Sequence, residues 1–273
     1  VVVVLALGPL GARAAGHDVG VAAGGGSARQ APAVLLVPHQ AGGEFVEQFR
    51  PAVVSFHFGL PDAALIEQIK RWGTRILSTA TTVEEAIWLA DRGVDAVIAQ
   101  GVEAGGHRGS FLTSDMTTQA GTMALVPQVC AAVDLPVIAA GGIACAGAVE
   151  AALALGAAGV QVGTAFLLCP EARTSDLHRA AILSEASGHT ALTNVFTGRP
   201  ARGIVNRLVR EMGPMAANAP AFPAAANAIT ALRAAAEKTG RNDFTPMWCG
   251  QDATGCREVP AAELLQGLRP TGR

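Results

Sequence analysis

The chain has 273 residues, 50% of them hydrophobic, and a formal net charge of only −2. This near-neutral balance and the lack of any basic run exclude a nucleic-acid footprint and a docking surface for anionic lipid. No stretch approaches the ~18 consecutive apolar residues of a membrane span. The 5 cysteines form no Cys-x-x-Cys pair, which indicates reduced thiols rather than disulfides or a metal site. We therefore expect a cytoplasmic protein that handles a small molecule, as a monomer or a homodimer.

Residues 1–52 give the weakest pattern in the chain. Apolar runs at residues 1–7 and 34–37 are candidate short strands, and only residues 44–49 show a trace of helical periodicity. Glycine and proline between these runs indicate loops. We expect this N-terminal segment to be divergent, and the sequence assigns no chemistry to it.

A regular alternation of strands and helices begins at Val53. Apolar runs of strand length start 22, 21, 40 and 23 residues apart, with helical patterns between them. The strands start at Val53, Arg75, Ala96, Pro136 and Gly159, and the helical patterns cover residues 62–72, 83–92, 119–133 and 146–155. Such a chain of βαβ units demands a parallel sheet covered by helices. Residues 53–170 are therefore predicted to form a parallel β/α barrel core.

The pattern changes after residue 170. Helical periodicity covers residues 177–186, 202–211, 221–238 and 261–268, with glycine- and proline-containing turns between most of these stretches. Helical hairpins after the last strand of a barrel commonly cover its site. Residues 171–273 are therefore predicted to form a helical cap and a C-terminal segment.

The strand that starts at Ala96 opens into a loop too rich in glycine to be predicted as strand or helix. The loop carries Gln100, Glu103, His107 and Arg108, and polar side chains after a buried parallel strand collect at the active-site edge of a sheet. An isolated histidine is more often structural, but a reference pKa near 6.5 and this loop favour a functional His107. Arg108 could neutralise an anionic substrate or pair with a surface carboxylate such as Glu103.

Two adjacent strands end in glycine-containing turns, at residues 139–143 and 161–164. Each turn leads into a helix or helical turn, where backbone N–H groups favour an anion. Barrels place phosphate sites after their last two strands, so these turns predict phosphate binding; the alternative is a tight turn and nothing more. Because neither a Walker nor a Rossmann glycine motif is present, a mononucleotide such as FMN is favoured over ATP.

His57 shares one strand face with Ser55 and Gly59, and two interpretations apply to it. It either approaches a ligand at the barrel mouth or is a hydrogen-bonded core histidine, and the second is favoured. Zinc hydrolysis and serine-hydrolase chemistry are unsupported, because His-Glu-x-x-His, Gly-x-Ser-x-Gly and spaced Cys/His clusters are all missing from the sequence.

Several motifs together resemble the nitronate monooxygenase family, formerly called the 2-nitropropane dioxygenases. Residues 100–109 read Gln-Gly-Val-Glu-Ala-Gly-Gly-His-Arg-Gly, residues 136–143 read Pro-Val-Ile-Ala-Ala-Gly-Gly-Ile, and residues 159–164 read Gly-Val-Gln-Val-Gly-Thr. Residues 53–59 and 197–203 agree with the same family. The resemblance extends to about Gln251 and implies an FMN-dependent oxidation of alkyl nitronates by O₂, giving a carbonyl compound and nitrite.

The resemblance also implies roles for individual residues. His107 would face the substrate as the catalytic residue, either binding the nitronate or taking an α-proton from a neutral nitroalkane. The implied FMN contacts are Gln100, Gly105, Gly142, Gln161, Val162, Gly163 and Thr164. The family's opening Pro-Met-Ala-Gly turn and its Asn-bearing strand are not visible in residues 1–52. The predicted fold is therefore a TIM-type (β/α)₈ barrel, incomplete or divergent at its N-terminal end, with a C-terminal helical cap.

Two other functions stay open from the sequence. The same architecture would suit a flavin-dependent enoyl reductase of fatty-acid synthesis. A chain without the opening turn could also bind a flavin or a partner without turnover.

Overall fold

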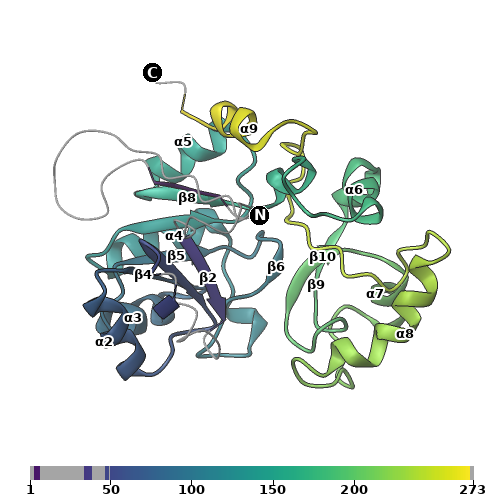
Figure 1. Ribbon diagram of the computed structural model, residues 1–273, viewed down its shortest axis with the longest axis horizontal. Coiled ribbons are helices and arrows are strands. Elements are labelled where there is room, and N and C mark those ends of the chain that lie inside the picture. Colours follow the sequence, from purple (N-terminus) through teal and green to yellow (C-terminus); the bar gives the residue numbers. More distant parts are fainter. Residues whose placement is uncertain (1–2, 7–33, 39–46, 49, 271–273) are drawn as a thin grey trace. The chain divides into compact units, whose positions relative to one another are not determined.

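The computed structural model describes residues 3–6, 34–38, 47–48 and 50–270, which divide into two compact units (Figure 1). The first unit comprises Val1–Val102, Gly109–Val162 and Arg269–Arg273. The second comprises Glu103–Arg108 and Gly163–Leu268. The short segment Glu103–Arg108, which carries His107, therefore belongs to the second unit, although the residues on either side of it belong to the first.

A seven-stranded sheet organises the described part of the first unit. Across the sheet the order is β1 (Val3–Ala6), β8 (Gly159–Val162), β7 (Val137–Ala140), β5 (Ala96–Gln100), β4 (Arg75–Ala80), β3 (Val53–His57) and β2 (Val34–Pro38). From β2 to β8 every strand runs parallel to its neighbours, whereas β1 pairs antiparallel with β8. The carboxyl ends of the parallel strands thus form one common edge.

Helices connect the parallel strands in chain order. They are α2 (Ala63–Arg71), α3 (Val83–Asp91), α4 (Thr122–Ala132) and α5 (Ala146–Ala154), and a 3₁₀ turn, η1 (Met116–Thr118), precedes α4. Capping side chains set two of the starts: Asp62 accepts a hydrogen bond from Leu65 N, and Thr82 accepts one from Glu85 N. Parallel strands that pair in chain order, with helices between successive strands from β3 to β8, define the TIM-type α/β fold, and the predicted fold class is confirmed.

The central strands of the sheet are buried on both faces, which explains why they read as continuous apolar runs. All residues of β5 and β7 are buried, and a cluster of Leu77, Ile98 and Ile138 lies between neighbouring strands. Burying one such side chain stabilises the fold by about 1.5–3 kcal/mol relative to leaving it in water. The packed strands give the carboxyl edge a rigid support.

The second unit is not purely helical. It contains a three-stranded antiparallel sheet in the order β6 (Gly106–His107), β10 (Ala201–Ile204) and β9 (Thr190–Thr193). Its helical elements are η2 (Thr164–Leu168), α6 (Asp176–Leu183), η3 (Glu185–Gly188), α7 (Arg207–Met212), α8 (Ala225–Glu237) and α9 (Ala261–Gly267). Residues of α7 and α8 join an apolar cluster around Val195 and Phe196.

Two local predictions were wrong in this unit. The predicted helix 202–211 begins as strand β10, and only its second half is helical. The cause lies elsewhere in the chain: β10 pairs with β9 and β6, and a Cβ at Gly203 would lie 2.8 Å from the carbonyl oxygen of Met247. The predicted loop around His107 contains strand β6, which is formed by pairing with β10.

Candidate functional site

The predicted site residues divide between the two units. Gln100, Gly142, Gln161 and Val162 belong to the first unit, and Gly105, His107, Gly163 and Thr164 belong to the second. Among the described residues, no group of three or more His, Cys, Asp or Glu side chains is placed to hold a metal ion. No helix within that same part of the chain is long and apolar enough to cross a membrane.

Gln100 ends strand β5 at the carboxyl edge and is buried. Its side-chain oxygen Oε1 accepts a hydrogen bond from the backbone N–H of Gly109 at 2.8 Å. This bond identifies the oxygen end of the amide and leaves Nε2 as the donor end. The role of Gln100 toward a cofactor stays a prediction.

Gly109 lies directly against the ends of strands β3 and β4. A Cβ at this position would lie 2.6 Å from Thr79 Cγ2 and 2.9 Å from His57 Cε1, so the close approach requires glycine. The Nδ1 atom of His57 is 3.2 Å from Thr79 Oγ1. His57 is thus a half-buried histidine in contact with Thr79, and its role toward a ligand stays a prediction.

The turn after β7 depends on two glycines in the left-handed region. Gly141 has φ +113° and Gly142 has φ +68°, values that other residues rarely adopt. The hydroxyl of Thr122, at the start of α4, donates to the carbonyl oxygen of Gly141 at 2.9 Å and helps to hold the turn in place. The glycines therefore make the tight turn that the sequence indicated, while their role toward an anion stays a prediction.

Gln161 carries the one buried side-chain N or O atom of the described residues that has no hydrogen-bond partner, its Oε1. An unsatisfied buried acceptor costs about 1–3 kcal/mol, so such atoms usually mark a missing partner. Oε1 can only accept, and the group that satisfies it must be a donor. The residue lies at the end of β8, within the predicted cofactor turn.

The second unit ties together three segments that are distant in sequence. A Cβ at Gly105 would lie 2.6 Å from Gly250 N and 2.7 Å from the carbonyl carbon of Cys249, so its glycine is required by backbone packing. Gly250 N in turn donates to the hydroxyl oxygen of Thr164 at 2.9 Å. Since this hydroxyl accepts from Gly250, its own hydrogen can be donated to a ligand.

His107 lies half-buried among aromatic side chains of the second unit. The centroid of its ring is 5.4 Å from that of Trp248 and 5.8 Å from that of Phe222. Its Nε2 atom is 2.9 Å from the hydroxyl oxygen of Thr197. The histidine therefore has aromatic neighbours and a polar contact at Nε2.

The neighbours of Thr197 define the protonation of this ring. The Thr197 hydroxyl lies 2.9 Å from His107 Nε2 and 3.2 Å from the carbonyl oxygen of Arg199. When it donates to Arg199, it accepts from His107 Nε2–H, and in that tautomer of the neutral ring Nδ1 carries the lone pair. Burial, and secondly the nearby Arg199 charge, lower the pKa of His107 from 6.5 to about 4. The imidazole is therefore neutral at physiological pH.

Arg108 does not lie at the surface, where one of the two sequence interpretations had placed it. Its side chain is fully buried, and its backbone N–H donates to the carbonyl oxygen of Pro200 at 2.8 Å. A solvent-exposed ion pair is therefore excluded for Arg108. The guanidinium whose charge acts on His107 belongs to Arg199.

Sequence reasoning missed the residues that define the environment of His107. Thr197 and Arg199 belong to the run 197–203, which had contributed to the family resemblance without an assigned role. Phe222 fell within the predicted helix 221–238, whereas α8 begins at Ala225, and nothing in the sequence marked it as a neighbour of His107. The separation of about 90 residues between His107 and Thr197 left no local pattern to detect.

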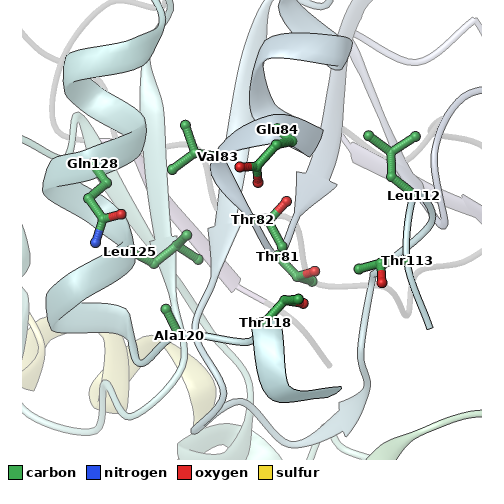
Figure 2. A pocket seen from close by; sticks show the side chains of 10 residues that line it. All are labelled: Thr81, Thr82, Val83, Glu84, Leu112, Thr113, Thr118, Ala120, Leu125 and Gln128. Atoms are coloured by element: carbon green, nitrogen blue, oxygen red, sulfur yellow. The ribbon is translucent and has the colours of Figure 1, made fainter. Parts of the chain in front are cut away.

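A separate pocket of about 460 Å³ opens in the first unit (Figure 2). It is lined by Thr81, Thr82, Val83, Glu84, Leu112, Thr113, Thr118, Ala120, Leu125 and Gln128. None of the predicted site residues lines it, and its lining contains one carboxylate and no basic side chain. This pocket is therefore poorly suited to an anionic substrate or a phosphate.

The sheet and its carboxyl-edge residues place the chain in the class of TIM-type α/β proteins, and comparison with known proteins refines this class. The family model described as nitronate monooxygenase matches residues 37–270. The chain belongs to the nitronate monooxygenase family, which confirms the resemblance seen in its motifs.

Two curated relatives illustrate the similarity. The chain is 46% identical over 220 residues to a nitronate monooxygenase of Pseudomonas aeruginosa and 42% identical over 238 residues to one of Paraburkholderia phytofirmans. The alignments cover 80% and 87% of this chain, and 63% of each relative. The chain thus spans less than two thirds of the length of these relatives.

Solved structures agree with the fold. A nitroalkane oxidase from Streptomyces ansochromogenes superimposes with a TM-score of 0.77 at 44% identity, over 83% of this chain and 65% of that one. FabK from Thermotoga maritima superimposes with a TM-score of 0.66 at 25% identity, over 86% and 74% of the two chains.

Proposed function

We propose that this chain oxidises alkyl nitronates with O₂ to a carbonyl compound and nitrite, with FMN as the cofactor. The observation that carries the proposal is the environment of His107: a neutral imidazole, anchored by Thr197 and close to the positive charge of Arg199. A nitronate is a small anion with an apolar chain. The cation suits its charge, and the rings of Trp248 and Phe222 suit its chain.

The residues present suit FMN. The unpartnered oxygen of Gln161 needs a donor, which a ribityl hydroxyl offers and a phosphate oxygen does not. The glycine turn at Gly142 and the hydroxyl hydrogen of Thr164 suit the phosphate, and the donor end of Gln100 suits an acceptor on the isoalloxazine ring. Gly105, Val162 and Gly163 would supply backbone contacts. When bound, FMN supplies the redox chemistry.

The side chains of the second unit would orient the substrate and manage its charge. His107 would face the substrate as the catalytic residue, while the contact of Nε2 with the Thr197 hydroxyl holds the ring in place. With a neutral nitroalkane, the His107 ring would take the α-proton. With a nitronate, Arg199 would offset the negative charge and the aromatic rings would exclude water.

Flavin titration followed by oxygen uptake tests the proposal. The purified chain should develop a bound-flavin absorbance spectrum with FMN and then consume O₂ with an alkyl nitronate, releasing nitrite. His107→Asn should retain FMN and lose most of the turnover. NADPH consumption driven by an enoyl thioester, without nitronate turnover, would assign the enoyl reductase activity instead. Flavin binding without either reaction would support the non-catalytic alternative.

A further inference from the structure

Glu85 is a carboxylate with no exposed surface in the first turn of α3. It lies three residues after Thr82, whose hydroxyl oxygen accepts a hydrogen bond from Glu85 N at 3.2 Å. This Thr-x-x-Glu spacing is that of a capping box, in which the glutamate normally bonds back to the cap residue. Here the carboxylate reaches past the end of the helix to other partners.

Four donors surround the Glu85 carboxylate. Its Oε2 accepts from the backbone N–H of Thr81 at 2.7 Å and from the Thr81 hydroxyl at 2.8 Å. Its Oε1 accepts from the backbone N–H groups of Phe111 at 2.6 Å and Leu112 at 3.1 Å. Within the described residues, no basic side chain forms an ion pair with Glu85. A carboxylate has about four lone-pair positions, so these donors match its full accepting capacity.

The segment Gly109–Leu112 is held at several further points in the same unit. The ring of Phe111 lies 5.0 Å from that of Trp88 on α3. It also lies against the backbone of Gly59, where a Cβ would come within 3.3 Å of it. At the start of the segment, Gly109 N donates to Gln100 Oε1. The segment therefore links the Glu85 carboxylate to the Gln100 amide.

We propose that Glu85 is a positioning residue for the flavin: it fixes the segment Gly109–Leu112 and, through Gly109, the orientation of the Gln100 amide. The inference rests on the proposed FMN function, because Gln100 is one of the residues assigned to the cofactor. Burying a carboxylate without a cation is costly, and an apolar residue would avoid that cost. Only a group that accepts hydrogen bonds without donating any can satisfy both Thr81 donors and the backbone N–H groups of Phe111 and Leu112 at the same time.

The Glu85→Gln variant tests this assignment, since it keeps the shape and replaces one acceptor oxygen by an NH₂ donor. We expect FMN to bind about tenfold more weakly, within the range reached by coupled residues of one hydrogen-bond network. Glu84→Gln is the matched control, because Glu84 is exposed in the same helical turn. It should bind FMN like the wild type.

A double-mutant cycle with Gln100→Ala separates positioning from a general structural role. If Glu85 acts through Gln100, the Glu85→Gln substitution should weaken FMN less than twofold in the Gln100→Ala background. A merely structural role would weaken binding by the same factor in both backgrounds and would overturn the proposal. Wild-type affinity in Glu85→Gln would overturn it as well.

Two further results keep the test decisive. If Glu85→Gln is not recovered folded, Phe111→Ala disturbs the same segment from its other side and should show the same coupling to Gln100; additive effects would refute the proposal. If the wild-type chain binds no FMN, the proposed function fails and this inference fails with it. If the wild-type chain binds FMN but the effects of the two substitutions are additive, the inference about Glu85 fails and the proposed function stands.

Discussion

The charge of His107 offers a direct test of the second unit, and it needs no cofactor. Burial and the Arg199 charge lower the pKa of His107 to about 4 in the folded chain, from an ordinary value of 6.5. Between pH 6.5 and pH 4, His107 is therefore mostly protonated in the unfolded chain and mostly neutral in the folded chain. Stability attributable to this group is fully present above pH 6.5 and falls as the pH drops toward 4.

The size of the effect follows from these two values. Between pH 7 and pH 5, proton uptake by the unfolded chain should lower the free energy of unfolding by roughly 2 kcal/mol through His107 alone. Substitution by glutamine removes the titrating group and keeps an amide nitrogen that can reach Thr197. Between pH 7 and pH 5, the free energy of unfolding of the His107→Gln variant should therefore fall by about 2 kcal/mol less than that of the wild type.

Two measurements check the prediction. Ring proton shifts followed by NMR give the His107 midpoint directly, and Arg199→Gln should raise it, because a repelling charge is lost while burial remains. Urea unfolding at pH 7 and pH 5, followed by Trp248 fluorescence in a Trp72→Phe, Trp88→Phe background, gives the stability difference for the second unit.

The control is His189→Gln, since His189 is exposed in the same unit. This variant should keep the pH dependence of the wild type. A His107 midpoint near 6.5, or identical pH dependence in wild type and His107→Gln, would refute the argument that the ring is held neutral by its surroundings.

Substitutions at three further positions have expected outcomes. Gly105→Ala should destabilise the second unit by about 1–3 kcal/mol in urea unfolding, because its Cβ would meet the backbone of Cys249 and Gly250; a cost near zero would contradict the packing. Gly147→Ala, exposed on α5 with open space around it, should stabilise the first unit by about 0.5–1 kcal/mol. Thr197→Val should lower nitronate turnover while Thr197→Ser retains it, because only serine keeps the oxygen that holds His107 Nε2.

The parallel strands of the first unit were predictable because their signal is local. Buried parallel strands need apolar side chains on both faces, and short helices fill the intervals between them. The predicted starts at Val53, Arg75, Ala96 and Gly159 coincide with β3, β4, β5 and β8, and β7 begins one residue after the predicted Pro136. At that position proline has no N–H to donate to a neighbouring strand.

The strands of the second unit could not be predicted in the same way. The residues of β10, Ala-Arg-Gly-Ile, form neither an apolar run nor an alternation, and they are extended because β9 and β6 pair with them. The capping box at Thr82 and Glu85 was visible in principle, since its spacing is local. The contacts of Glu85 with Phe111 and Leu112 were not, because they join a helix start to a loop about 26 residues later.

The chemistry of His107 shows how partners distant in sequence change what a motif means. From its ordinary pKa alone, His107 would exchange protons near neutral pH. With the pKa lowered to about 4, its lone pair belongs to a weak base, roughly two orders of magnitude less basic than free imidazole. Such a ring is poorly matched to removing a proton from a neutral nitroalkane at neutral pH. It remains a good partner for a substrate that is already ionised, since an anion close by would offset the Arg199 charge and raise the pKa of the ring. On the proposed function, we therefore expect turnover of a nitronate to exceed turnover of the corresponding neutral nitroalkane at neutral pH.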